Sequence, residues 1–484
     1  MTYLGFDLGT SGLRALLIDD GGHPVASAEA HYHTSHPHPG WSEQDAGAWT
    51  DAASTVMAQL QASHPKAVAA IQSIGVSGHM HGATLVGDDG EVLRPCILWN
   101  DTRSHAEAAK LDALPEMRAI SGNIVFPGFT APKLLWVKKH EPKIFERISK
   151  VLLPAAYMNF WLTGDAFADM SDSAGTSWLD TGARDWSDTL LSHGAMRVDQ
   201  MPRLVEGCEI GGTLRPELAK VWGIKGNPSV VGGAGDNAAA ASGIGAIGAG
   251  TGFVSLGTSG VLMVARDDYC PDPATAVHTF CHALPSRWYQ MGVILAATDS
   301  LNWVSNVMDA RPDQLSALLG DALSGPSDLR FLPYLSGERT PHNDSAIRGA
   351  FLNLDIAHTR ADLVQAVMEG VAFALADCKF SLQQTGAEFD QIFAIGGGAR
   401  SEIWVQMLAT ILDMPLHLPK DGEFGAAIGA ARLAMIGATG ADPETVLTKP
   451  ETARVITPQK DLVEAYAQAH HAYRKTYAIM KELP

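Results

Sequence analysis

The chain has 484 residues, and this length predicts two or three domains because a single hydrophobic core rarely serves so many residues. Hydrophobic residues make up 46% and charged residues 18%, a composition typical of globular proteins that argues against disorder. The 35 basic and 53 acidic residues give a formal net charge of -18, which argues against nucleic acid and anionic membranes as partners.

The first predicted element is a strand over residues 3–8, whose single charged residue is Asp7. The glycine loop GTSG follows, and a second strand over 13–18 returns from it. A third strand is expected over 24–33, after the turn-forming sequence DDGG at 19–22. The chain therefore begins with antiparallel strands joined by short turns.

The pentapeptide LGTSG occurs at residues 8–12 and again at 256–260. The second copy also lies between two apolar runs, so it predicts the same strand, turn and strand. A shared hairpin half a chain apart predicts two related domains, 1–243 and 244–484, which meet in the glycine-rich run 243–250.

The glycines of both copies allow successive backbone N–H groups to converge, and the hydroxyl side chains between them add donors. Such loops suit phosphate oxygens without a lysine, although each copy alone could be only a turn between strands. The candidate phosphate-binding residues are Gly9, Thr10, Ser11, Gly257, Thr258 and Ser259.

A strand-like run over 70–76 ends in a loop that carries His79, Met80 and His81. The His-x-His spacing suggests a metal, but no third ligand is near in the sequence. Side chains on a loop at a strand end more often contact a small substrate, so we expect this role for Met80 and His81.

The sequence LWNDTR places Trp99 and Asp101 beside Arg103. Sugar sites combine aromatic rings, which cover C–H faces, with polar groups that hold hydroxyls, so Trp99 and Asp101 are candidate sugar ligands. A structural salt bridge between Asp101 and Arg103 is the competing interpretation.

Residues 228–231 are predicted to form a buried strand, followed by a glycine loop and a helix that starts at Asp236. The Asp236 carboxylate could accept a proton from a substrate hydroxyl, with Asn237 as a neighbouring substrate ligand, or it could simply cap the helix. A helix N-terminus is expected to lower the pKa of this carboxyl and make it a weak base.

A third glycine loop follows the predicted strand 389–395 and precedes a helix over 402–412. Its residues Gly397, Gly398 and Ala399 offer a bare backbone against which adenine or ribose could lie.

Other motifs are absent or out of context. No P-loop pattern GxxxxGK[ST] occurs, and the GxGxxG at 243–248 follows a helix-like run where a dinucleotide fold requires a strand. The uncharged segment 237–265 is long enough to cross a bilayer, but its many glycines disfavour a continuous helix. Five scattered cysteines without a CxxC pair, and an N-terminus without a signal-peptide pattern, predict a cytoplasmic protein.

Over essentially its whole length the sequence resembles the FGGY carbohydrate kinases of the actin, hexokinase and Hsp70 superfamily. The resemblance is carried by both LGTSG loops, by GGGAR at 396–400, by GFTAPKLLWVKKH at 128–140, and by GAFLNL with DLVQAVME at 349–354 and 362–369. Asn353 stands where the family pattern has glycine, and asparagine tolerates a positive φ less freely.

The resemblance implies an α/β protein of two ribonuclease-H-like domains that close over ATP and a sugar in an interdomain cleft, frequently as a homodimer. It implies Asp236 as the proton acceptor, Asp7 at the Mg²⁺ and phosphate end, and Met80 with His81 in the sugar site.

The implied reaction is transfer of phosphate from ATP to the terminal hydroxyl of a ketopentose, D-xylulose at O5. The segments that suggest this sugar are MHG at 80–82, WND at 99–101 and FLPYLSGERTPH at 331–342. Two alternatives stay open: a kinase of ribulose, fuculose, gluconate or glycerol, and a non-enzymatic protein that uses nucleotide to switch shape.

Overall fold

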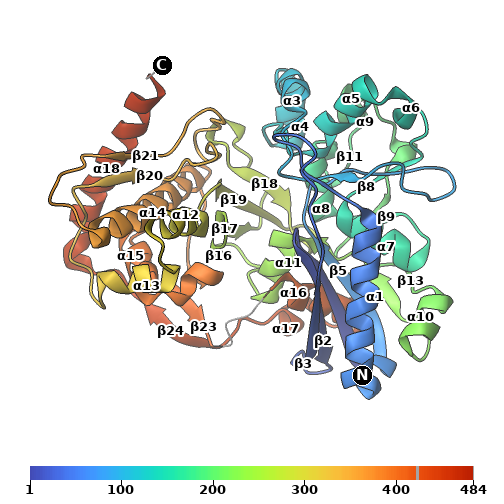
Figure 1. The fold of residues 1–484 in the computed structure, drawn as a ribbon. Helices are drawn as coiled ribbons and strands as arrows, with labels where there is room; N and C mark the ends of the chain where they lie inside the picture. Colours follow the sequence, from blue (N-terminus) through green and yellow to red (C-terminus); the bar gives the residue numbers. More distant parts are fainter. Residues whose placement is uncertain (421–424, 483–484) are drawn as a thin grey trace.

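The N-terminal apolar runs form the centre of the first of two mixed sheets in the computed structural model, which describes residues 1–420 and 425–482 (Figure 1). β1 is antiparallel to β2, β2 is antiparallel to β3, and β5 lies parallel to β1 on its other side. β14 continues parallel to β5, and β13 is antiparallel to β14. The strands are β1 (Thr2–Leu8), β2 (Gly12–Asp19), β3 (Pro24–His31), β5 (Ile71–Gly78), β13 (Ile210–Thr213), β14 (Ser229–Val231) and β15 (Ala234–Gly235).

The second sheet repeats this plan. β16 is antiparallel to β17, β17 to β19, and β22 and β23 continue parallel to β16. β18 and β24 are antiparallel strands at its edges. The strands are β16 (Thr251–Leu256), β17 (Gly260–Arg266), β18 (His278–Cys281), β19 (Trp288–Ile294), β22 (Gln391–Ile395), β23 (Leu416–Pro419) and β24 (Thr452–Ile456). The repeated order confirms the predicted pair of α/β halves, while the boundary between 243 and 244 stays a prediction.

The two hairpins made by LGTSG differ in register. Leu8 pairs with Leu13, so four loop residues separate the first pair of strands. Leu256 pairs with Gly260, so the last glycine of the second copy belongs to the ladder. The same five residues therefore make a wider loop in the first half than in the second.

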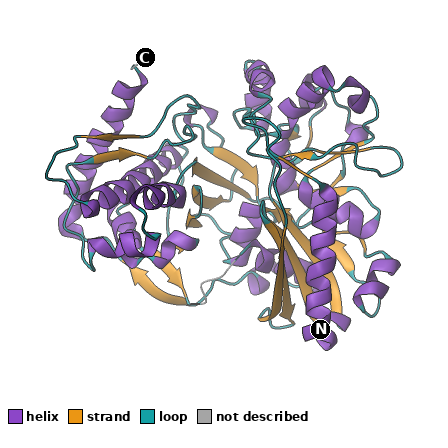
Figure 2. Cartoon of the chain, in the orientation of Figure 1, coloured by secondary structure: helices purple, strands orange, loops and turns teal. Residues whose placement is uncertain are grey.

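Helices flank the strands of each half (Figure 2). In the first half, α1 (Ala46–Ser63) packs on β2 and β3, and its buried residues join the core around β1. In the second half, the long α14 (Arg360–Gln384) packs on β19 and β17. Other helices of the second half are α12 (Thr298–Met308), α13 (Pro312–Ser316), α15 (Glu402–Ile411) and α18 (Lys460–Lys481).

A separate apolar cluster stands above the first sheet, in the upper right of Figure 1. It is built largely from short helices that insert between the strands of the first half. These are α3 (His105–Asp112), α4 (Pro115–Ser121), α5 (Thr130–His140), α6 (Pro142–Phe145) and α9 (Asp188–His193). The neighbouring α7 (Pro154–Thr163) belongs instead to the core around β1. The insertion carries the segment 123–133, which becomes one wall of the site described below.

Two helices pack against each other between the sheets: α11 (Asp236–Gly243) and α16 (Ala426–Thr439) (Figure 1). Although α16 comes late in the chain, it lies on the first sheet, where glycines admit it. A Cβ on Gly5 would lie 2.0 Å from the Ala427 carbonyl oxygen, and one on Gly75 would lie 2.2 Å from that of Ala430. The two halves thus share a central core.

The described residues contain no helix that is both long and apolar enough to cross a bilayer. The uncharged segment 237–265 is instead divided among α11, β16 and β17. The GxGxxG at 243–248 begins at the end of α11, so it follows a helix and lacks the strand that a dinucleotide fold requires.

Candidate active site

The first glycine loop is held by side chains that sequence reasoning missed. Tyr32 Oη donates to the Gly9 carbonyl at 2.5 Å, and Gln44 Nε2 donates to the Thr10 carbonyl at 2.5 Å. Trp99 Nε1 donates to Thr10 Oγ1 at 3.1 Å. Because Thr10 Oγ1 accepts from the indole, its own proton stays available for a ligand oxygen. Trp99 therefore acts here by orienting Thr10.

Asp101 lies behind this loop in a buried ion pair. Its carboxylate accepts from Arg103 Nη2 and from the Ser42 amide, both at 2.7 Å. Asp101 is 1% exposed. The Arg103 guanidinium stacks on Trp41, with 3.6 Å between the guanidinium carbon and the ring centroid. The bonds from Arg103 Nη2 and the Ser42 amide end on Oδ2, and Oδ1 accepts from the Arg103 amide and from Arg103 Nε, both at 2.9 Å. Both carboxylate oxygens are occupied, so the salt-bridge interpretation accounts for Asp101 and the geometry does not support a sugar contact.

Asp236 is the first residue of α11, and the N-cap position belongs to Gly235. Asp236 Oδ1 accepts from the Asn237 amide at 2.7 Å and from Asn237 Nδ2 at 2.8 Å. Among the described residues, Oδ2 has no hydrogen-bond partner. The helix-cap interpretation is therefore wrong for Asp236, and Asn237 holds the carboxylate in place while Oδ2 stays free.

Burial raises the pKa of Asp236 to about 6, although the two hydrogen bonds from Asn237 lower it. The expectation of a depressed pKa at a helix N-terminus is wrong. Loss of hydration raises the pKa of this carboxyl by more than the helix dipole lowers it. A carboxylate with this pKa is ionised at neutral pH and is a better proton acceptor than an exposed aspartate.

Asp7 is the second carboxylate of this group. Its pKa is raised to about 7, mainly by burial and also by the negative charge of Asp236, while the positive charge of Arg14 opposes the increase. Two neighbouring carboxylates that repel each other favour a divalent cation, and carboxylate oxygens are the donors that Mg²⁺ prefers. The residues present therefore fit Mg²⁺ at Asp7.

A buried acidic network backs the start of α11, and nothing in the sequence singled it out. Ser171 N and Oγ donate to Asp169 Oδ2 at 2.6 and 2.5 Å, and the Gly235 amide donates to Ser171 Oγ at 3.0 Å. Burial raises the pKa of Asp172 well above its ordinary value, and the charges of Asp169 and Asp236 add to this. The network fixes the backbone that presents Asp236.

Met80 packs against this same helix start. Tyr289 Oη donates to Met80 Sδ at 3.9 Å, and a Cβ on Gly235 would lie 3.0 Å from Met80 Cγ. The side chain that the sequence assigns to the sugar site is thus adjacent to the residue before Asp236.

His81 follows in a left-handed conformation, with φ +70°. Its Nδ1 lies 2.7 Å from the Gly175 carbonyl, so Nδ1 carries the proton and Nε2 is an acceptor. The ring stacks on Phe129 with 4.3 Å between centroids. Lys133, in the family signature but given no role from sequence, donates its Nζ to the His81 carbonyl at 2.8 Å and to the Gly128 carbonyl at 2.6 Å. Burial lowers the pKa of His81 to about 3, so the ring is neutral.

His79 takes no part in this group. It is buried against Trp49, with 5.7 Å between ring centroids. Residues 1–420 and 425–482 hold no cluster of three side chains suited to a metal ion, so the His-x-His metal site finds no support.

The second and third glycine loops lie against each other in the second half. Thr298 N and Oγ1 donate to the Gly257 carbonyl at 2.9 and 2.8 Å. Gly396 has φ +87°, and a Cβ on it would lie 2.8 Å from the Leu256 carbonyl oxygen. A Cβ on Gly398 would lie 2.7 Å from Leu256 Cβ. Only glycines allow this close approach.

A pocket of about 860 Å³ opens beside the third loop, between α12, α13 and the start of α15. Gly397 and Gly398 line it on one side, and Arg454 and Gln459 line it on another. A nucleoside fits a pocket of this size. The remote lining residues could not be found from sequence, because they come from segments far apart along the chain.

The predicted site residues thus fall into two groups. The first contains Asp7, Gly9, Thr10, Ser11, Met80, His81, Trp99, Asp236 and Asn237. Within it, a charge interaction links Asp7 to Asp236, and hydrogen bonds link Asn237 to Asp236 and Trp99 to Thr10. The second contains Gly257, Thr258, Ser259, Gly397, Gly398 and Ala399, whose backbone amide donates to the Gly396 carbonyl at 3.1 Å.

Comparison with known proteins gives one consistent result. The profile of the FGGY family of carbohydrate kinases, N-terminal domain, matches residues 2–243, and that of the C-terminal domain matches residues 252–438. The chain is 45% identical to a xylulose kinase of Escherichia coli strain K12, over 98% of this chain and 96% of that protein.

Solved structures of similar proteins point to the same family. A "xyloylose kinase" from Brucella ovis is 55% identical and superposes with a TM-score of 0.98, covering all of both chains. A gluconate kinase from Lactobacillus acidophilus is 26% identical with a TM-score of 0.92, covering 99% of this chain and 98% of that one. The expected fold, that of the two-domain sugar kinases in the actin, hexokinase and Hsp70 superfamily, is confirmed. Both family domains and full-length relatives match, and we conclude that the chain belongs to the FGGY family of carbohydrate kinases.

Proposed function

We propose that the protein transfers the γ-phosphoryl group of ATP to O5 of D-xylulose, giving D-xylulose 5-phosphate and ADP. The observation that carries the proposal is Asp236, whose Oδ1 is held by Asn237 while Oδ2 stays free, next to Gly235, against which Met80 packs. The choice of sugar is supported by the relatives named xylulose kinase, which match over nearly the whole chain.

The proposed reaction begins with the sugar's terminal hydroxyl at Asp236. Its carboxylate accepts the hydroxyl proton as the oxygen bonds to the γ-phosphorus, and the bond from that phosphorus to the β,γ-bridging oxygen breaks. The transition state is loose, so the carboxylate mainly orients the oxygen. His81 Nε2, an acceptor, takes a hydrogen bond from another sugar hydroxyl.

The polyphosphate is proposed to lie on the glycine loops, with Thr10 Oγ1 donating to a phosphate oxygen and the backbone of 257–259 holding others. Asp7 would hold Mg²⁺, which when bound neutralises charge on the phosphates. The nucleoside is proposed to occupy the pocket of about 860 Å³ beside Gly397 and Gly398, with Ala399 ending the loop. Closure of the two halves over both substrates would exclude water.

The proposal extends to the setting of the enzyme. We infer a homodimer in the cytoplasm, acting on small molecules and without a nucleic acid or membrane partner. The net charge of -18 supports the last two points. Sedimentation equilibrium at micromolar concentration tests the dimer, and a single species of about monomer mass, 51.4 kDa, would contradict it.

A panel of acceptors tests the reaction: D-xylulose, D-ribulose, L-fuculose, D-gluconate and glycerol, each assayed by ADP release with saturating ATP and Mg²⁺. We expect kcat/KM for D-xylulose to exceed that for each other acceptor by about 100-fold. Similar values for D-ribulose and D-xylulose would contradict the choice of sugar. No ADP release with any acceptor would favour the non-enzymatic nucleotide switch.

A further inference from the structure

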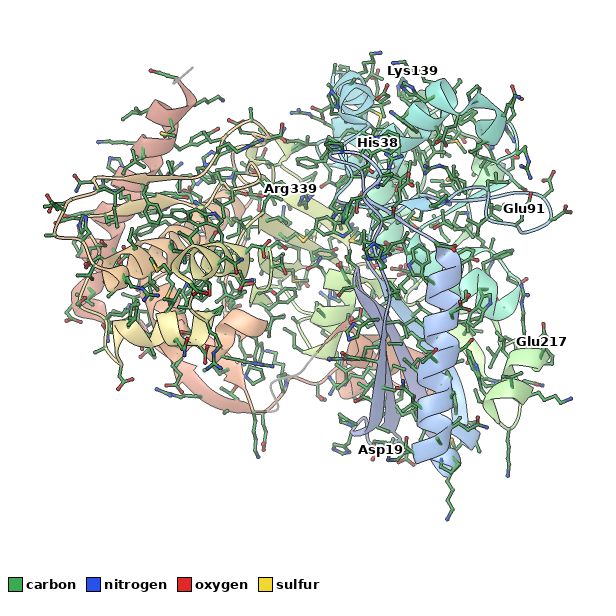
Figure 3. All side chains as sticks on the ribbon, viewed as in Figure 1. Asp19, His38, Glu91, Lys139, Glu217 and Arg339 are labelled. Atoms are coloured by element: carbon green, nitrogen blue, oxygen red, sulfur yellow. The ribbon has the colours of Figure 1, made fainter. Side chains whose placement is uncertain are left out.

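Arg339 reaches the candidate sugar site from the second half of the chain. It belongs to the segment that follows β20 (Arg330–Leu332), and Figure 3 labels it near the boundary between the two halves. Its guanidinium carbon lies 4.9 Å from the ring centroid of Phe126, a residue of the first half. The Phe126 ring is 5.5 Å from that of Phe129, which stacks on His81.

The backbone around Arg339 is firmly fixed. The Thr340 amide donates to the Val293 carbonyl at 3.0 Å, and the Val293 amide donates to Thr340 Oγ1 at 3.1 Å. Glu338 Oε1 accepts from the Leu295 amide at 3.0 Å and from the Arg339 amide at 2.7 Å. The segment is thereby attached to the end of β19, and the direction of the Arg339 side chain is set by a rigid base.

The Arg339 guanidinium is half-buried and, among the described residues, has neither a hydrogen bond nor an ion pair. The adjacent Glu338 does not neutralise it well, because burial raises the pKa of Glu338 to about 8. A guanidinium removed from water needs an acceptor, and its N–H groups can only donate. The side chain is therefore ready for a ligand oxygen.

The charge of Arg339 acts on one end of the site. It lowers the pKa of both His81 and the buried His278, after the larger effect of burial. The pKa of Asp236 is set by burial and by Asn237. Together with the ring contacts that run from Arg339 through Phe126 and Phe129 to His81, this effect on the two histidines places Arg339 on the histidine side of the candidate sugar site.

The chemistry of the proposed substrate fixes what lies at that end. Ring closure of a 2-ketopentose to a furanose consumes O5, so the molecule with a free O5 hydroxyl is the open chain with a C2 ketone. The ketone oxygen is the one oxygen of the sugar that can accept but not donate a hydrogen bond. The Arg339 guanidinium, which can only donate hydrogen bonds, is complementary to this ketone oxygen, which can only accept them.

We propose that Arg339 donates a hydrogen bond to the C2 carbonyl oxygen of the open-chain ketose and so determines the preference for ketoses over polyols. The inference rests on the proposed function, and it adds a specificity residue from the second half to a sugar site built mainly by the first.

The experiment compares three acceptors with the unaltered protein and with Arg339→Met. D-Xylulose has O1 and the C2 ketone, 1-deoxy-D-xylulose lacks O1 but keeps the ketone, and xylitol replaces the ketone with a secondary alcohol. We expect Arg339→Met to lower kcat/KM about 10- to 100-fold for both ketoses, mainly through KM, and much less for xylitol. The affinity of Arg339→Met for D-xylulose, measured by calorimetry without ATP, should fall by a similar factor.

Arg348→Met is the matched control, because Arg348 is exposed in the same segment and donates to nearby carbonyls such as that of Ser345. Arg348→Met should leave kcat/KM unchanged for all three acceptors. Arg339→Lys, which keeps a positively charged donor, should lose less kcat/KM for the ketoses than Arg339→Met. If Arg339→Met does not fold, Arg339→Gln makes the same comparison.

Three results would overturn the inference: no loss with Arg339→Met, an equal loss for all three acceptors, or a loss that disappears with 1-deoxy-D-xylulose. Failure of the proposed function is distinct, because it would appear as no turnover of D-xylulose by the unaltered protein, and it would overturn the inference as well.

Discussion

At the scale of single residues, Asp236 is governed by two opposing effects. Burial raises its pKa, and the two hydrogen bonds from Asn237 lower it. The sequence shows Asp236 at a predicted helix start, but it cannot show that Gly235 takes the cap position or that the site excludes water. Those properties depend on packing by residues distant in the chain, such as Ser171, which binds the Gly235 amide.

Asp236→Asn should lower kcat by about 10²- to 10⁴-fold, because the amide cannot accept the hydroxyl proton. The dissociation constant of ATP should change less than about twofold, since Asp236 is assigned to the sugar hydroxyl. Steady-state kinetics and calorimetry measure the two quantities. Asp188→Asn is the control, because Asp188 is the first residue of α9 but is exposed. Appreciable kcat in Asp236→Asn would contradict the proton-acceptor role.

The pH dependence follows from the same carboxyl. Asp236 accepts a proton only when ionised, and its pKa is raised to about 6. Activity should therefore be full above this pKa and be lost as pH falls through it. We expect log kcat/KM for D-xylulose to decrease with a slope of about one per pH unit below pH 6. A profile that stays flat to pH 4.5 would show that Asp236 keeps an ordinary pKa.

Asp7 gives a separate prediction about the cation. EDTA should abolish turnover, and added Mg²⁺ should restore it. Asp7→Asn should raise the Mg²⁺ concentration needed for half-maximal rate, because it removes the carboxylate proposed to hold the ion. Titration of activity with Mg²⁺ at fixed ATP measures the shift. An unchanged Mg²⁺ requirement in Asp7→Asn would place the ion elsewhere.

At the scale of elements, Asn353 shows how a local departure from a family pattern is accommodated. It has φ +67°, so the position keeps the left-handed conformation that glycine adopts easily. Asn353 Nδ2 also donates to the Asp328 carbonyl at 3.2 Å. Asparagine is one of the few residues tolerated in this conformation.

Asn353→Ala should destabilise the protein by about 1 to 2 kcal/mol, because alanine is strained at this φ and loses the hydrogen bond. Asn353→Gly should stay within about 1 kcal/mol of the unaltered protein. Melting temperatures by differential scanning fluorimetry compare the variants. Asn306→Ala, on exposed helical backbone of α12, controls for loss of an amide and should not destabilise. Equal melting temperatures for Asn353→Ala and Asn353→Gly would contradict the conformational argument.

The strands around the glycine loops could be predicted because alternating apolar runs and glycine turns are local signals. The register of each hairpin could not. Tyr32 and Gln44 hold the first loop, whereas Thr298 holds the second, and these side chains come from different elements. Identical pentapeptides therefore adopt different registers because their surroundings differ.

At the scale of the whole molecule, the sequence predicts two related halves but not how they are joined. Gly75 contacts Ala430, which lies far from it in the chain, and the sequence around neither residue predicts this contact. The candidate sugar site has the same property, since Arg339, which we propose as one of its residues, contacts Phe126 across the halves. Sequence motifs locate the glycine loops, but only the folded structure shows which residues from distant parts of the chain lie together in the candidate site.

Gly75→Ala should destabilise the protein by about 1 to 3 kcal/mol, because its Cβ would lie 2.2 Å from the Ala430 carbonyl oxygen and displace α16. Gly248→Ala is the matched control, since a Cβ there meets no atom within 4 Å. Thermal unfolding of both variants tests the difference. Equal melting temperatures would show that α16 moves aside without cost.

The position of α16 also decides whether the chain can be divided. A fragment that stops at 243 would keep the first sheet but lose the helix that covers its glycine face. A fragment that begins at 244 would carry that helix with no sheet to cover. Each polypeptide would expose apolar surface that only the other can bury, so the protein should tolerate a nick between the halves but not their separate synthesis.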